Sequence, residues 1–171
     1  MIKVVLTGSE STGKTELAHR LGRHFGAPVA EEFVRDYAAE RGGNLGFDDH
    51  GPIARGQIES EDAAITLATD LAILDTDLVS TVVYCEHYFG RCPPWIEKEA
   101  QARAAELYLL LKPDIPWVAD GVRDRGDRRD EMHDLFKQKL DAMGLNYVDL
   151  GGDREARFAS AVRAIESFGT R

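Results

Sequence analysis

The chain has 171 residues, which is enough for one well-buried domain and too few for two of ordinary size. Its formal net charge of −9 argues against a nucleic-acid partner and against binding to an anionic membrane. No apolar run approaches the roughly 20 residues of a membrane span, and the first residues show no signal-like pattern. Cys85 and Cys92 have no metal-binding spacing and are expected to be buried free thiols. These features predict a single cytoplasmic domain over residues 1–171.

A glycine-rich segment stands between a predicted strand and a predicted helix. It reads Gly-Ser-Glu-Ser-Thr-Gly-Lys-Thr, follows the apolar run 2–6, and precedes an amphipathic stretch with Leu17, Leu21 and Phe25 on one face. This order is typical of a phosphate-binding P-loop, in which backbone N–H groups and a helix N-terminus face an anion. The segment predicts ATP binding through Gly8, Ser9, Glu10, Ser11, Thr12, Gly13, Lys14 and Thr15.

Two side chains of this segment have more specific roles. Lys14 is expected to reach the β- and γ-phosphates and to support catalysis, and the Thr15 hydroxyl is expected to ligate Mg²⁺. ATP and Mg²⁺ are therefore the predicted cofactors.

A short second strand at 28–30 precedes a predicted helix at 33–40. Glu32 closes this strand, where a general base can face an acceptor, and Glu31 competes for the same role. The alternative interpretation is that Glu32 is an ordinary acidic residue at the start of a helix, where the helix dipole favours negative charge. Arg35 shares the helical face of Glu32, so it is expected to bind substrate or orient the carboxylate, with a surface ion pair as the alternative.

The next acidic residues follow a predicted helix at 53–68 and an apolar strand at 71–74, the pattern of a parallel strand covered on both faces. Asp75 closes this strand as a Walker B aspartate would, and we assign it to Mg²⁺ through water. Asp77 is assigned to a substrate hydroxyl or a second water, with a capping role for the following helix as the alternative.

Aromatic side chains gather around a chain break at 90–94. The segment 78–89 is predicted to be a helix, although its β-branched residues also suit a strand, and a further helix is predicted at 95–105. Tyr88 and Trp95 are candidates for stacking on a substrate base, and ordinary packing is an equally open alternative.

The last part of the chain holds an arginine-rich segment at about 121–130, which we interpret as a lid. Arg123, and after it Arg128, are expected to reach the transferring phosphoryl group, with a solvated helix start as the alternative. Gly152 follows the last strand and is a further cofactor-binding candidate. The flanking elements are predicted at 107–111 (strand), 131–143 (helix), 146–150 (strand) and 155–168 (helix).

Strands alternating with helices predict an α/β fold of three layers, a P-loop NTPase fold with a mainly parallel five-stranded sheet and helices on both faces. Ligands bind such sheets at the carboxyl ends of the strands. The acidic and glycine-rich residues named above all follow predicted strands, so we expect them to share one crevice.

In its ordered motifs the chain resembles the ribosylnicotinamide kinase domain of NadR-type proteins, within the AAA_28 group of small P-loop kinases. The resemblance implies ATP- and Mg²⁺-dependent phosphorylation of the 5′-hydroxyl of nicotinamide riboside, giving nicotinamide mononucleotide for NAD synthesis. It further implies that Glu32, Arg35 and Asp77 line the acceptor site and that Arg123 belongs to the lid. One departure is Glu31, which stands where relatives often carry an aromatic residue. The matching motifs are residues 8–15, 32–37, 75–77, 88–90 with Pro93-Pro94, and 117–123.

Two other functions stay open on the sequence. A kinase of the same fold would phosphorylate another nucleoside or small alcohol, and a nucleotide-switched binding module would hydrolyse ATP slowly and signal through a partner. The sequence favours a small nucleoside as the partner molecule and leaves homo-oligomer formation undecided.

Overall fold

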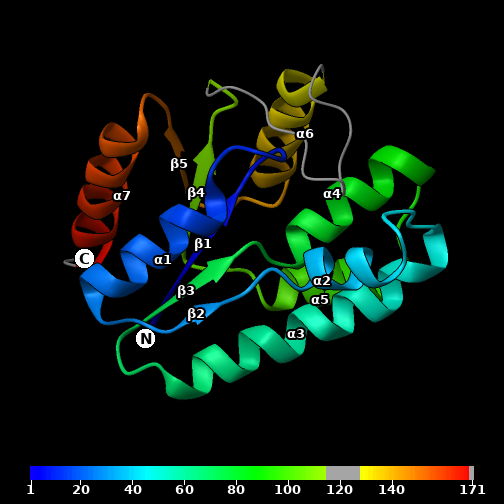
Figure 1. The fold of residues 1–171 in the computed structure, drawn as a ribbon, viewed down its shortest axis with the longest axis horizontal. Coiled ribbons are helices and arrows are strands. Elements are labelled where there is room, and N and C mark those ends of the chain that lie inside the picture. The colour runs from blue at the N-terminus through cyan, green and yellow to red at the C-terminus, as the bar shows by residue number, and fades with distance from the viewer. Residues whose placement is uncertain (115–127, 170–171) are drawn as a thin grey trace.

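Parallel strands form the centre of the structure, a computed structural model that describes residues 1–114 and 128–169. Its five-stranded sheet has the order β2-β3-β1-β4-β5, and every neighbouring pair is parallel (Figure 1). The central strands β1, β3 and β4 are almost entirely buried because they are covered on both faces. The strands are β1 Ile2–Thr7, β2 Val29–Ala30, β3 Leu71–Asp75, β4 Leu107–Leu111 and β5 Tyr147–Leu150.

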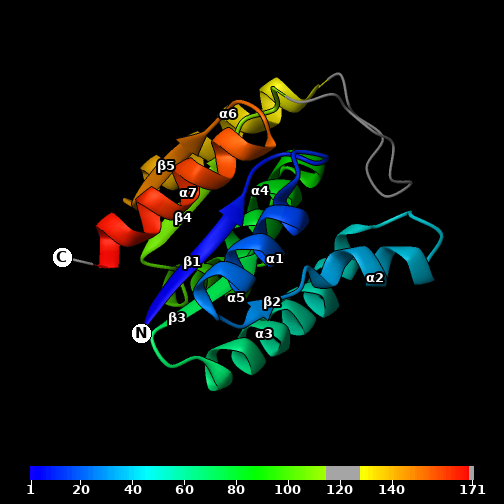
Figure 2. The same cartoon turned by 60° about the vertical axis from the view of Figure 1, so that its left-hand side comes forward.

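Helices cover both faces of the sheet and divide the core in two (Figures 1 and 2). On one face α1 and α7 pack against the sheet through residues such as Leu21 and Ile165. On the other face α3, α4, α5 and α6 pack through residues such as Val82, Ile96 and Phe136. The helices are α1 Lys14–Phe25, α2 Phe33–Glu40, α3 His50–Leu67, α4 Leu78–Phe89, α5 Pro94–Ala102, α6 Arg129–Ala142 and α7 Arg154–Gly169, with a 3₁₀ turn, η1, at Phe47–Asp49.

The predicted three-layer α/β fold is confirmed, and the differences lie at the ends of elements. The segment 78–89 is the helix α4, because its apolar residues pack into the core from a helix that begins at the Asp77 cap. Helix α3 begins at His50, earlier than predicted, and α5 ends at Ala102, also earlier. Cys85 and Cys92 are buried free thiols, as predicted. Within residues 1–114 and 128–169, the helices are too short or too polar to cross a membrane.

The strand register brings the functional segments to one edge of the sheet. Leu6, next to the last residue of β1, pairs with Asp75 at the end of β3, and Ala30 at the end of β2 pairs with Leu74. The P-loop, the Glu31–Glu32 segment and the Asp75–Asp77 segment therefore leave the sheet side by side. This is the edge at which parallel α/β sheets bind ligands.

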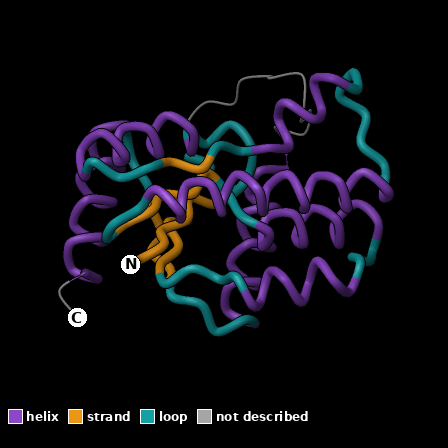
Figure 3. Tube along the Cα trace, turned by 90° about the horizontal axis from the view of Figure 1, so that it is seen from below, coloured by secondary structure: helices purple, strands orange, loops and turns teal. Residues whose placement is uncertain are grey.

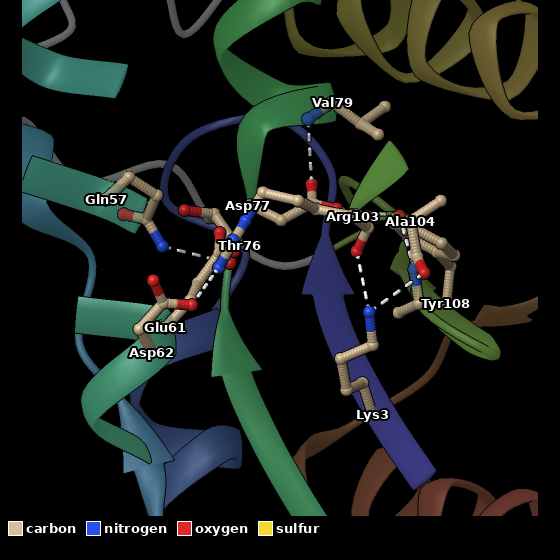
Figure 4. A network of polar contacts seen from close by, with 11 residues as sticks. Lys3, Gln57, Glu61, Asp62, Thr76, Asp77, Val79, Arg103, Ala104 and Tyr108 are labelled. Carbon is tan, nitrogen blue, oxygen red and sulfur yellow. Dashed lines mark hydrogen bonds and ion pairs between the residues drawn. The ribbon is translucent and has the colours of Figure 1, made fainter. Parts of the chain in front are cut away.

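A network of buried polar groups lies below this edge, between α3, the β3–α4 junction and β4 (Figure 4). Asp77 caps α4 by accepting from Val79 N at 3.1 Å, and its other carboxylate oxygen accepts from Tyr108 OH at 2.7 Å. Glu61 of α3 pairs with Arg103, whose Nε lies 3.2 Å from Glu61 Oε2. Burial raises the pKa of Asp77 to about 6, and burial together with the charge of Asp77 raises the pKa of Glu61 to about 7.

Replacing Glu61 with glutamine is expected to flatten the pH dependence of stability. The pKa of Glu61 is raised from 4.5 to about 7, so around neutral pH the folded chain holds a proton that the unfolded chain releases. This contribution to stability is complete below the unfolded pKa and is lost as pH rises through the folded pKa. The wild type should therefore lose up to about 3 kcal/mol of unfolding free energy between about pH 5 and 8 that the variant retains.

Urea denaturation across this pH range measures the difference. Asp62→Asn is the matched control, because Asp62 shares Arg103 with Glu61 but is exposed, and its substitution should leave the slope unchanged. A Glu61→Gln protein that keeps the wild-type slope would contradict the raised pKa.

Candidate nucleotide and acceptor site

The P-loop has the backbone of an anion cradle. Ser11 and Gly13 have left-handed φ angles of 53° and 85°, which turn neighbouring N–H groups toward a common point. Gly8 has φ 130°, and a Cβ at this position would lie 2.8 Å from the carbonyl oxygen of Leu111. Only glycine therefore fits at position 8, where the loop passes the end of β4.

Lys14 lies across this loop as the first residue of α1. Its Nζ donates to the carbonyl oxygens of Ser9 at 2.6 Å and Gly8 at 3.2 Å, and the residue is buried. The loop is further held by Thr12 Oγ1, which donates to Ser9 O at 2.9 Å. The ammonium group is thus fixed at the mouth of the cradle, where a terminal phosphate would lie.

Thr15, Asp75, Glu32 and Arg35 form one polar cluster beside the cradle. Thr15 Oγ1 donates to Asp75 Oδ2 at 2.6 Å. Arg35 Nη2 lies 3.3 Å from Glu32 Oε2 and 3.5 Å from Thr15 Oγ1, so it joins the second strand end to the P-loop. Burial and then the charge of Glu32 raise the pKa of Asp75. The cluster therefore holds two acids in close, poorly solvated surroundings.

Thr15 and Asp75 are suited to hold Mg²⁺. Asp75 Oδ1 is buried, and no hydrogen-bond partner for it occurs among the described residues, so it can accept a metal-bound water. Groups of three or more His, Cys, Asp or Glu suited to a metal are absent from the described parts of the chain. Mg²⁺ bound here would take its other ligands from phosphate oxygens and water.

Two predicted acceptor-site residues, Asp77 and Glu31, are not part of this cluster. Both oxygens of Asp77 accept hydrogen bonds inside the protein, from Val79 N and Tyr108 OH, so the structure favours the capping interpretation over substrate binding. Glu31 is exposed and forms an ion pair with His19 of α1 at 3.3 Å. Glu32 is the acid of this strand end that lies with Asp75, because successive residues of an extended segment point to opposite sides.

Tyr88 is linked to the P-loop through a neighbouring tyrosine. Tyr84 OH donates to Glu10 Oε2 at 3.2 Å, and the Tyr84 and Tyr88 rings are stacked with centroids 6.1 Å apart and an interplanar angle of 12°. Tyr88 remains 45% exposed, so one end of α4 offers an aromatic surface. Trp95 lies elsewhere, against α3, with the guanidinium of Arg55 5.4 Å from its ring centroid.

The lid arginines are only partly described by the structure. Arg123 lies outside the described residues. Arg128, the second predicted lid arginine, lies 4.0 Å from Glu131 in a surface ion pair. Its neighbour Arg129 donates from Nη1 to Ser11 O at 3.3 Å, because this residue begins α6 and faces the cradle. Among the described arginines of this segment, Arg129 is thus the one bonded to the P-loop.

Arg157 was not predicted as a site residue, and it ties the P-loop to the segments that follow β4 and β5. Its guanidinium donates to Thr12 O at 2.6 Å, Lys112 O at 2.6 Å and Gly152 O at 2.9 Å, and it pairs with Asp114. Gly152, a predicted cofactor residue, is therefore held next to the P-loop. No local motif marks this arginine, since its partners at Thr12 and at 112–114 lie in two distant segments of the chain. Beside it opens a pocket lined by Thr12, Gly13, Glu16, Leu17, Arg20, Arg154 and Arg157.

The chain matches a known protein family over most of its length. A family model described as an AAA domain, AAA_28, matches residues 3–157. The chain belongs to the AAA_28 family. Within this family the NadR-type resemblance is confirmed, because the chain is 32% identical over 169 residues to the trifunctional NAD biosynthesis/regulator protein NadR of Escherichia coli strain K12. That match covers 95% of this chain and 41% of the E. coli protein.

Solved structures show the same relationship. A NadR protein in complex with NR superposes with a TM-score of 0.83 and 27% identity, covering 98% of this chain and 50% of that one. A NadR protein in complex with NAD and AMP-PNP gives a TM-score of 0.84 and 25% identity, covering 99% of this chain and 50% of the other. The AAA_28 chain thus spans about half or less of the length of these relatives.

Proposed function

We propose that this chain is an ATP-dependent kinase that phosphorylates the 5′-hydroxyl of nicotinamide riboside and yields nicotinamide mononucleotide. The observation that carries the proposal is the meeting of an anion cradle with the Glu32–Arg35–Thr15–Asp75 cluster at one edge of the sheet. Relatives named for NAD biosynthesis, and a NadR structure in complex with NR, support the choice of acceptor.

In the proposed reaction Glu32 is the general base. The 5′-hydroxyl oxygen attacks the γ-phosphorus of ATP, the bond from that phosphorus to the bridging oxygen of ADP breaks, and the hydroxyl proton passes to the Glu32 carboxylate. Arg35 orients Glu32 through the ion pair at 3.3 Å. Because Glu32 is buried, its carboxylate is held in one place and is poorly solvated.

Positive charge around the cradle acts on the transferring phosphoryl group. Lys14 and the backbone N–H groups of residues 8–15 balance its charge, and Arg129 lies next to the loop at Ser11. Mg²⁺ held by Thr15 and Asp75 would neutralise the phosphate oxygens when bound. Arg123 stays a proposed lid residue.

The two ligands are proposed to bind on opposite sides of the cradle. The pocket beside Arg157 and Gly13 adjoins the P-loop, so we assign it to the nucleoside part of ATP. On the other side, the exposed face of Tyr88 suits a cationic pyridinium ring, because aromatic faces attract cations. Glu10, which accepts a hydrogen bond from the neighbouring Tyr84, adds to this preference for a positively charged base.

A panel of nucleosides tests the acceptor. We expect ADP release with Mg²⁺ and ATP to rise at least tenfold on adding nicotinamide riboside, and to rise much less with uridine, thymidine or adenosine. Uridine is the matched control because its ring is of similar size but uncharged. A response to another nucleoside alone would replace the proposed substrate, and ADP release that ignores every nucleoside would overturn the kinase proposal.

A further inference from the structure

Gln57 of α3 bridges the two acid-bearing segments of the site. Its Oε1 accepts from the backbone N–H of Phe33 at 3.1 Å, directly after Glu32. Its Nε2 donates to the carbonyl oxygen of Thr76 at 3.3 Å, directly after Asp75 (Figure 4). Gln57 is 3% exposed; its hydrogen bond to Thr76 is buried, and the one to Phe33 is partly buried.

The hydrogen bond to Phe33 satisfies a backbone group at the start of a helix. Phe33 is the first residue of α2, where N–H groups have no partner within the helix. Glu32 makes no side-chain capping bond to its own helix, and its carboxylate lies beside Arg35. Ser60, one turn along α3, also donates to Glu31 O at 3.0 Å, so α3 holds the peptide units on both sides of Glu32.

The hydrogen bond to Thr76 secures a strained backbone. Thr76 has φ 65°, a left-handed conformation that is strained for a β-branched residue. Its N–H donates to Leu6 O at 3.0 Å, and its carbonyl oxygen accepts from Gln57. This conformation turns the backbone out of β3 directly after Asp75.

Close packing between α2 and α3 fixes the position of Gln57. A Cβ at Gly56 would lie 2.3 Å from the ring of Phe33, so the start of α2 rests directly on α3 at this glycine. Figure 3, turned by 90° from Figure 1, shows several helices running side by side next to the strands. Gln57 therefore meets both segments at a distance that packing leaves little freedom to change.

We propose that Gln57 is a positioning residue, which sets the distance between the general base Glu32 and the metal-binding Asp75 by binding the backbone next to each. A side-chain amide suits this task because it offers one acceptor and one donor in a fixed plane. Glutamate would lose the donor, and leucine would lose both groups. The kinetic consequence of this inference rests on the proposed function, and the hydrogen bonds themselves do not.

This bridge, the pair of hydrogen bonds from Gln57 to Phe33 and Thr76, can be tested in the wild type at Phe33 without any assay of activity. Hydrogen exchange of backbone amides, followed by NMR, should show Phe33 exchanging at least tenfold more slowly than Val34 and Arg35 in the same first turn of α2. Exchange of Phe33 as fast as these neighbours would overturn the bridge, whatever the protein phosphorylates.

Substitution tests the positioning role. Gln57→Leu should remove the protection of Phe33 and lower kcat about 10- to 100-fold, while KM for ATP stays within twofold because the P-loop is untouched. Thr66→Ala is the control, since Thr66 bonds only within the exposed side of α3 and should change neither quantity. A folded Gln57→Leu protein with wild-type kcat would refute the positioning role. If the wild type phosphorylates no nucleoside, the proposed function fails, and the exchange experiment still decides the bridge.

Discussion

Replacing Lys14 with alanine is expected to lower turnover by about 10²–10³-fold in a protein that still folds. The ammonium group lies over the P-loop, 2.6 Å from Ser9 O and 3.2 Å from Gly8 O, where the terminal phosphate of ATP would bind. Its charge acts most strongly on the phosphoryl group in transit, so its loss should lower kcat more than it raises KM for ATP. Steady-state kinetics and circular dichroism measure the two effects.

Arg23→Ala provides the matched control for this substitution. Arg23 is an exposed cation on the same helix, in its last turn, so the variant removes the same charge far from the cradle. It should keep wild-type turnover. A Lys14→Ala protein with near-normal turnover would contradict the role assigned to the lysine.

Replacing Glu32 with glutamine should remove the general base with little change of shape, and we expect kcat to fall by about 10²–10⁴-fold. Glu32 is buried beside Arg35 and close enough to Asp75 to raise the pKa of that carboxyl. Glutamine can still accept from Arg35, so the packing of α2 should persist. Single-turnover measurements with saturating ATP and nucleoside isolate the chemical step.

Glu31→Gln is the control for Glu32→Gln, because it makes the same chemical change at the adjacent position. Glu31 is exposed and pairs with His19, away from the cluster, so its substitution should alter kcat less than twofold. The reverse pattern, a large loss at position 31 and none at position 32, would transfer the base to Glu31.

Local patterns were sufficient to predict the fold and the cradle. Glycine at 8 and 13, a lysine and a threonine before an amphipathic helix, and an aspartate at the end of an apolar strand each depend on neighbours in sequence. The structure confirms the strand–turn–helix context and brings Thr15 to Asp75 at 2.6 Å, although these residues are far apart in the chain. That contact follows from the pairing of β1 with β3. The alternating pattern predicted a parallel sheet but not which strands are neighbours.

The remaining details depend on contacts that sequence spacing does not encode. The position of Asp77 in the sequence suggested an acceptor-site residue, but its second carboxylate oxygen accepts a hydrogen bond from Tyr108 on β4. Arg157 and Gln57 look like ordinary helix residues, and their partners become visible only when distant segments are packed. The choice between Arg128 and Arg129 likewise depends on which face of α6 meets the loop.

The proposed phosphoryl transfer is tested most directly by following the terminal phosphoryl group of labelled ATP. With γ-³²P ATP, Mg²⁺ and nicotinamide riboside, the label should appear in nicotinamide mononucleotide at the rate of ADP release. Label that appears only in inorganic phosphate, at the same rate with or without the nucleoside, would contradict transfer to an alcohol and indicate a hydrolytic P-loop protein instead.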